Sequence, residues 1–130
     1  MPQPGLASEI TDFLDAHIDS IPQMEILMLL HDGRDRGWPV DVIASRIYQP
    51  ISAVLPLLRG LQAHGLVTVD GAGDAVLYRY HDREETRPLM AKVVTAYRTQ
   101  LIEVTRFVHA KASRSVLEFA RAFDLKKDRP

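Results

Sequence analysis

The chain has 130 residues, of which 46% are hydrophobic, and a formal net charge of −1. This is enough to bury one respectable core, and nothing in the composition indicates two independent domains. Cysteine is absent, which excludes disulfides, thiolate metal sites and cysteine nucleophiles. Neither a secretory signal nor a membrane-spanning run is recognisable, so we expect one cytoplasmic domain over residues 1–130 with no membrane partner.

Acidic and basic residues are unevenly distributed along the chain. Every Asp, Glu, Lys or Arg residue before Arg34 is acidic, whereas Lys and Arg outnumber Asp and Glu from Arg98 onward. This polarity predicts that the first and last helices lie against each other, within one subunit or between two. Two solvated faces with no mutual contact are the alternative.

Two amino-terminal helices are expected in residues 6–33. Apolar residues recur at spacings of three and four over residues 6–18, which predicts an amphipathic helix that Ser8 caps. A second helix is expected to begin at Ser20, because Gln23 completes a capping box with it. Its apolar residues occupy more than one side, so we expect this helix to be mostly buried.

Residues 38–82 carry the pattern of a winged helix-turn-helix, with two short helices followed by a β-hairpin. The helices are expected to pack across a tight turn at residues 48–50. The second begins near Ser52, contains Pro56 and ends before Gly65. Two β-rich segments then flank a glycine-rich reversal, and residues 38–40 are expected to add a short third strand.

The carboxy-terminal part, residues 84–124, is predicted to be helical and to mediate dimerisation. If residues 84–111 form one helix, it is about 40 Å long and needs a partner. A final helix from about Ser113 is expected to fold back on it. Apolar residues follow a seven-residue rhythm, which predicts a subunit interface. This heptad seam consists of Met90, Val94, Tyr97, Leu101, Val104 and Val108.

The order of these elements resembles the MarR-type regulators and, more loosely, the PadR-type regulators, both winged-helix families. The resemblance is carried by the run from Ile43 and Ala44 to residues 65–67. It implies a mainly α fold with a small β-hairpin wing (α+β), a homodimer formed by the terminal helices, and insertion of the second motif helix into the major groove. It also implies a pocket for a small-molecule effector, and Tyr97, Phe107 and Trp38 are candidates to line it.

Several side chains suit contact with double-stranded DNA. Arg59 is the best candidate to read a base, because an arginine can donate two hydrogen bonds to guanine. The other candidates for base or phosphate contacts are Arg46, Gln49, Ser52, Arg79 and Arg83. The first hypothesis is therefore a homodimeric, DNA-binding transcriptional regulator that can respond to a ligand.

The second hypothesis is a winged-helix protein–protein interaction module that does not bind DNA. It rests on the small and apolar residues Leu55, Pro56, Gly60 and Ala63, which suit a protein partner better than a polyanion. Loss of DNA binding with added salt distinguishes the two hypotheses.

Catalysis, metal binding and cofactor binding are not predicted. No HxxxH or HExxH spacing links the histidines, and no serine hydrolase or phosphate-loop motif is present. The histidines are His17, His31, His64, His81 and His109.

Overall fold

Helices make up most of the computed structural model, which describes residues 5–127. The helices are α1 (Ser8–His17), α2 (Ile21–Asp32), α3 (Val40–Ile47), α4 (Ile51–Ala63), α5 (Arg87–Thr99) and α6 (Leu101–Lys127). The strands β1 (Val67–Asp70) and β2 (Leu77–Tyr80) form an antiparallel hairpin, and two 3-10 turns are η1 (Gly73–Ala75) and η2 (Glu84–Thr86). The predicted class, mainly α with a small hairpin wing, is confirmed.

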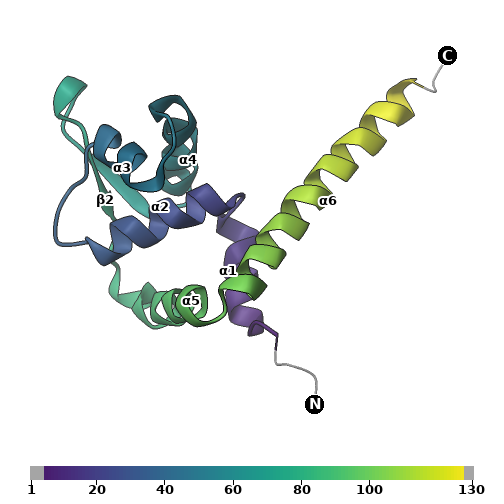
Figure 1. The fold of residues 1–130 in the computed structure, drawn as a ribbon, viewed down its shortest axis with the longest axis horizontal. Coiled ribbons are helices and arrows are strands. Elements are labelled where there is room, and N and C mark those ends of the chain that lie inside the picture. Colours follow the sequence, from purple (N-terminus) through teal and green to yellow (C-terminus); the bar gives the residue numbers. More distant parts are fainter. Residues whose placement is uncertain (1–4, 128–130) are drawn as a thin grey trace.

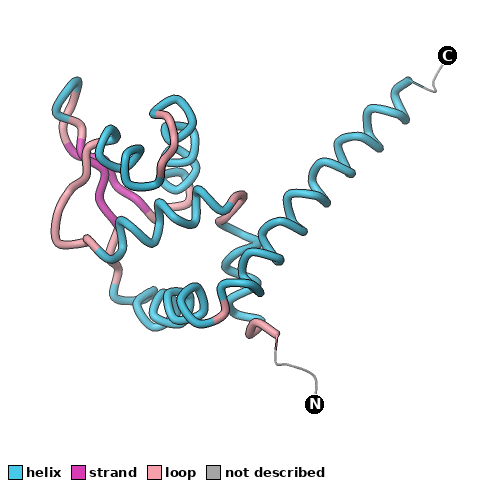
Figure 2. The backbone as a smooth tube through the Cα atoms, viewed as in Figure 1, coloured by secondary structure: helices cyan, strands magenta, loops and turns pink. Residues whose placement is uncertain are grey.

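Helix α2 lies at the centre of a lobe, between α5 on one side and the pair α3 and α4 with the hairpin on the other (Figure 1). Helix α1 packs against both α5 and α6. The carboxy-terminal half of α6 projects away from the lobe, and the tip of the hairpin points away from α5 (Figure 2). The helix-turn-helix and wing therefore occupy the end of the lobe opposite α5.

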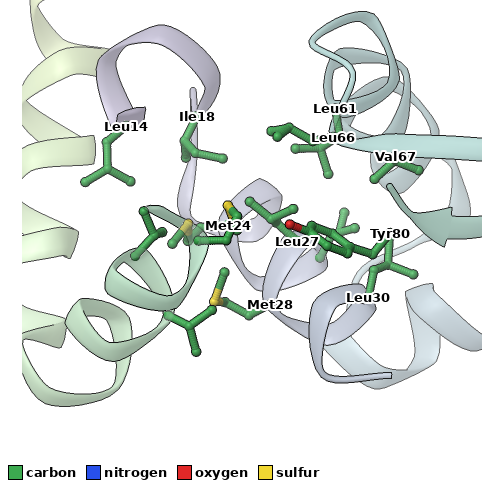
Figure 3. Packing of buried hydrophobic residues seen from close by; sticks show 14 of the residues in the cluster. Leu14, Ile18, Met24, Leu27, Met28, Leu30, Leu61, Leu66, Val67 and Tyr80 are labelled. Atoms are coloured by element: carbon green, nitrogen blue, oxygen red, sulfur yellow. The ribbon is translucent and has the colours of Figure 1, made fainter. Parts of the chain in front are cut away.

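The core surrounds α2 on nearly all sides. Side chains of α1, α2, the end of α4 and the hairpin converge there (Figure 3). Leu27 and Leu30 are completely buried, and each such side chain contributes about 1.5–3 kcal/mol relative to exposure. The prediction that α2 is mostly buried is confirmed.

Capping was predicted correctly at α2 and wrongly at α1. The Ser20 hydroxyl accepts a hydrogen bond from the backbone N–H of Gln23 at 3.3 Å. Ser8, by contrast, is the first helical residue of α1, and the preceding Ala7 supplies no side-chain cap. The buried Gln23 amide also reaches α4, where it donates to the carbonyl of Leu57 at 3.2 Å.

Gly60 faces α2, although the sequence had placed it on the exposed side of α4. A Cβ atom at Gly60 would approach the Gln23 amide nitrogen to 2.7 Å. The small residue therefore leaves room for the Gln23 amide between α2 and α4. Pro56 lies inside α4 on its exposed side, where water can satisfy the carbonyl that lost its hydrogen bond.

The prediction of one helix over residues 84–111 is wrong, as is the separate helix beginning at Ser113. Helix α5 ends at Thr99, Gln100 leaves the helical region with φ −129° and ψ 43°, and α6 runs without a break past Ser113. Threonine hydroxyls bonded to carbonyls one turn back promote bending. The Thr99 hydroxyl donates to the carbonyl of Thr95 at 2.7 Å, directly before the break.

The predicted contact between the acidic and basic ends of the chain is confirmed, and it lies within one subunit. Lys92 pairs with Glu9 at 2.9 Å, and Arg114 approaches Asp15 at 3.7 Å. The ammonium of Lys111 on α6 lies at the carboxy-terminal end of α1, as discussed below. Within residues 5–127, no helix is both long and apolar enough to cross a membrane.

Candidate nucleic-acid interface

A tight turn between α3 and α4 is the most exposed part of the helix-turn-helix. Tyr48 is 92% exposed and adopts the left-handed conformation, with φ 58°. The backbone N–H of the next residue, Gln49, donates to the carbonyl of Ala44 at 3.0 Å and closes the turn. A non-glycine residue in this region costs about 1–3 kcal/mol, and such strain concentrates at functional sites. The sequence pattern indicates Tyr48 only as a turn residue.

The exposed side of α4 continues from this turn. Ser52 and Arg59 are exposed, while Val54 and Leu58 are completely buried on the opposite side. Ile51, in the first turn, is 43% exposed. The structure thus brings the predicted candidates of the turn and of α4 onto one accessible surface.

The two arginines of the wing region, Arg79 and Arg83, have neighbours outside α4. Arg79 on β2 approaches the carboxylate of Asp70 at 3.5 Å, so part of its charge is neutralised within the hairpin. Arg83 follows the wing and lies close enough to α1 to lower the pKa of His17. These contacts tie Arg79 to the hairpin and place Arg83 near α1.

Trp38 forms the predicted third strand, reduced to a single pair with Tyr78. Their backbone groups exchange hydrogen bonds of 2.7 and 2.8 Å, and the indole N–H donates to the carbonyl of Gly33 at 3.1 Å. The guanidinium carbons of Arg36 and Arg46 lie 3.9 and 5.7 Å from the centre of the indole ring. We call Trp38, Arg36 and Arg46 the Trp38 cluster.

Arg36 was not among the residues selected from the sequence. Arg36 lies in a bend after α2, where its backbone N–H donates to the carbonyl of Gly33 at 3.2 Å, so no regular spacing in the sequence indicates its contact with Trp38. Arg46, which was selected, belongs to the last turn of α3 and stands two residues before the exposed Tyr48.

Most of the heptad seam is buried inside the subunit. Met90 and Val94 on α5, and Val104 and Val108 on α6, are at most 7% exposed. Tyr97 is half-buried, whereas Leu101 is 49% exposed at the break between the helices. The four buried side chains, those of Met90, Val94, Val104 and Val108, pack in the core of their own subunit, so they are not free to contact a second subunit.

A cavity of about 630 Å³ lies between the end of α2, the end of β2 and α5. Two ion pairs border it, Arg98 with Asp32 at 2.8 Å and Arg87 with Asp82 at 2.9 Å. Among the residues whose side chains are described, none is a hydrogen-bond partner of the buried Nδ1 atom of His31, since Asp32 at 3.7 Å is too distant. Trp38, Tyr97 and Phe107, the predicted pocket residues, do not line this cavity.

Histidines join the wing and helix α4 to the rest of the lobe. The Nδ1 atoms of His17 and His64 lie 3.0 Å apart, which links α1 to the end of α4. Burial, then the charges of His64, Lys111 and Arg83, lower the pKa of His17 below its ordinary value. Burial and then the charge of Arg34 lower the pKa of His31, against the opposing effect of Asp32 and Asp82.

We expect the free energy of unfolding to fall as the pH is lowered from 7.5 to 5.5. Both His17 and His31 have a lowered pKa in the folded protein, so the unfolded chain takes up protons first, below about pH 6.5. Stability is therefore complete above that pH and is lost as pH falls toward the folded-state values. Urea unfolding at several pH values measures this, and the double variant His17→Gln/His31→Gln should show a shallower dependence. An equally steep dependence in that variant would assign the effect to other groups.

Comparison with known proteins identifies the fold. No protein-family model matches the chain, and no curated protein matches its sequence. The structure is similar to that of a MarR family protein from Bacillus stearothermophilus, with a TM-score of 0.51 over 89% of this chain and 78% of the other. The two are 17% identical, so the similarity concerns the fold alone. The predicted resemblance to MarR-type proteins is confirmed at that level.

Proposed function

We propose that this MarR-like winged-helix chain is a transcriptional regulator that binds double-stranded DNA as a homodimer. The observation that carries the proposal is the accessible surface formed by the turn at Tyr48 and the exposed side of α4. In winged-helix proteins that bind DNA, the corresponding helix enters the major groove. Ser52 and Arg59 on this side can donate hydrogen bonds to base edges, and Gln49 stands beside them in the turn.

The homodimer is proposed from an apolar face of α6 that continues beyond the lobe. Val104 and Val108 are buried where α1 covers α6. Phe119 follows on the same side of the helix and Val116 on the adjoining side, and they are 74% and 67% exposed. A second copy of the chain supplies matching apolar surface. The predicted interface thereby moves from the buried part of the heptad seam toward the end of α6.

A response to a small-molecule effector is proposed at the cavity beside α5. Arg34, Arg87 and Arg98 line it together with two carboxylates, so its formal charge favours an anionic ligand. The cavity lies between the wing side of the lobe and α5, so that a ligand contacts both. The imidazole of His31 also lines it.

The interaction module remains the second candidate. Pro56 and Ala63 are exposed, as that hypothesis requires, but Gly60 faces α2 and is lost to the docking surface. Retention on DNA of mixed sequence at low salt, with a steep loss as salt is added, supports the regulator. No retention under the same conditions supports the module.

Arg59→Ala is expected to weaken specific DNA binding by about 1–3 kcal/mol, because one arginine reading a guanine contributes this much discrimination. The measurement is a fluorescence anisotropy titration of the full chain against DNA flanking its own gene. Arg106→Ala is the matched control, since Arg106 is also exposed but lies on α6. Equal affinities of wild type and Arg59→Ala would remove the assigned role of Arg59.

A further inference from the structure

We infer that the Trp38 cluster is a binding site for a phosphate of the DNA backbone, in which Arg36 and Arg46 are the contacting groups. This inference rests on the proposed function and adds to it a contact outside α4. It concerns affinity that does not depend on base sequence, whereas Arg59 is proposed to read a base.

The indole of Trp38 is a fixed platform. Its backbone is bonded in both directions to Tyr78, and its ring N–H is bonded to the carbonyl of Gly33. A Cβ atom at Gly33 would collide with the ring, which shows how closely the ring lies on the end of α2. Trp38 itself is only 3% exposed. A guanidinium that packs on this ring is therefore held in place, and little entropy is lost when it binds a ligand.

Stacking leaves the hydrogen-bonding edge of an arginine free. The guanidinium carbon of Arg36 lies 3.9 Å from the ring centre, within the range of a cation–π contact. A cation–π contact does not use the N–H donors of the guanidinium as hydrogen bonds to other groups, so a pair of them can bind two phosphate oxygens. A lysine at this position would offer neither the stack nor the paired donors.

The two positive charges are close to each other and are not neutralised by the protein. The two guanidinium carbons lie 3.9 and 5.7 Å from one ring centre, so their separation stays below the Debye length of about 10 Å at 0.1 M salt. Among the residues whose side chains are described, neither arginine forms an ion pair. Asp35 and Asp41 are neighbours in sequence, but they also form no ion pair with the cluster. An anion at the cluster relieves the mutual repulsion.

The location of the cluster suits a contact with the DNA backbone beside α4, the helix proposed to enter the major groove. Arg46 ends α3 and precedes the exposed turn that leads into α4. A duplex that α4 enters through its groove therefore passes next to the last turn of α3. In such complexes, phosphate contacts from flanking elements set the position of the helix in the groove.

The test compares Arg36→Gln with Arg106→Gln, because each removes one exposed positive charge. Affinity of the full chain for a labelled duplex of mixed sequence is measured by anisotropy between about 50 and 200 mM salt. Trp38 is the only tryptophan, so its emission reports the cluster in the same titration. We expect the log–log salt slope of Arg36→Gln to be less steep by about 0.9 for each lost contact, with a smaller change in Trp38 emission on DNA binding. Arg106→Gln should behave as wild type.

Arg46→Gln is measured in parallel as an independent change at the same cluster, and circular dichroism verifies the fold of each variant. If wild type binds DNA while both cluster variants keep its salt slope and emission change, the phosphate site is overturned and the proposed function stands. An equal loss of slope in Arg106→Gln also overturns the site, because the effect is then one of net charge. If wild type does not bind DNA even at low salt, the proposed function and the site both fail.

Discussion

Phe119→Asp is expected to convert the proposed homodimer into a monomer. Phe119 is 74% exposed in the single chain, and its burial by a partner contributes about 1.5–3 kcal/mol. A two-fold interface buries the residue twice, so the variant loses both contributions and also places two carboxylates in an apolar interface. We expect the dissociation constant of the dimer to rise at least about 100-fold, the equivalent of 2.8 kcal/mol.

Analytical ultracentrifugation over a range of protein concentrations measures the dimer constant. Arg121→Asp is the matched control, because Arg121 is exposed and lies roughly 200° around the helix from Phe119. The control should remain dimeric. A dimer of unchanged stability in Phe119→Asp contradicts the proposed interface, and a wild-type chain that is monomeric at all concentrations contradicts the homodimer itself.

Lys111→Met is expected to lower the free energy of unfolding by about 1.5–3 kcal/mol, the range for hydrogen bonds to a charged group. The ammonium of Lys111 donates to the carbonyls of Leu14, Asp15 and Ile18 at the end of α1, and it pairs with Asp19 at 3.1 Å. Its side chain is only 16% exposed, so water replaces these contacts poorly.

Urea unfolding of the variants measures this contribution. Lys92→Met is the matched control, because Lys92 also joins α1 to a carboxy-terminal helix, through Glu9 at 2.9 Å, but is 58% exposed. An exposed pair of this kind is worth about 0–1 kcal/mol. Equal losses of unfolding free energy in the two variants would show that the contacts of Lys111 with the carbonyls at the end of α1 stabilise the fold no more than an exposed ion pair does.

The helix-turn-helix, the wing and the capping of α2 were predictable because each has a local signal. Ser20 and Gln23 have the spacing of a capping box, and residues 70–74 contain the glycines that a hairpin reversal requires. The contact between the two ends of the chain was also predictable, since acidic residues accumulate in and just after α1 and basic residues in α6. These features depend on neighbours in sequence or on charge alone.

The break at Gln100 was not predictable from local signals. It contains neither glycine nor proline, and the apolar rhythm of the heptad seam continues across it. The rhythm indicated a buried stripe correctly, but it could not indicate that α1 of the same chain covers that stripe. Burial within a subunit and burial between subunits require the same side chains, so periodicity does not separate them.

The candidate site was only partly predictable for a related reason. Arg59 and Ser52 were placed outward because their buried neighbours on α4 are periodic. The left-handed backbone of Tyr48 has no composition signal, since such turns favour glycine or asparagine. The contact of Arg36 with Trp38 depends on the turn after α2, in which Arg36 bonds to the carbonyl of Gly33, and sequence spacing alone does not establish it.

In the proposed DNA-binding dimer, the bend at Gln100 sets the distance between the two half-sites of an operator. Helix α5 belongs to the lobe that contains α4, whereas α6 carries the proposed contact with the second copy of the chain. In the proposed dimer, the angle between α5 and α6 therefore determines the distance between the two copies of α4. Half-sites for such dimers are spaced by about one turn of DNA, or 34–36 Å, or by its multiples. Straightening this one joint would change the preferred separation of half-sites while leaving each half-site sequence the same.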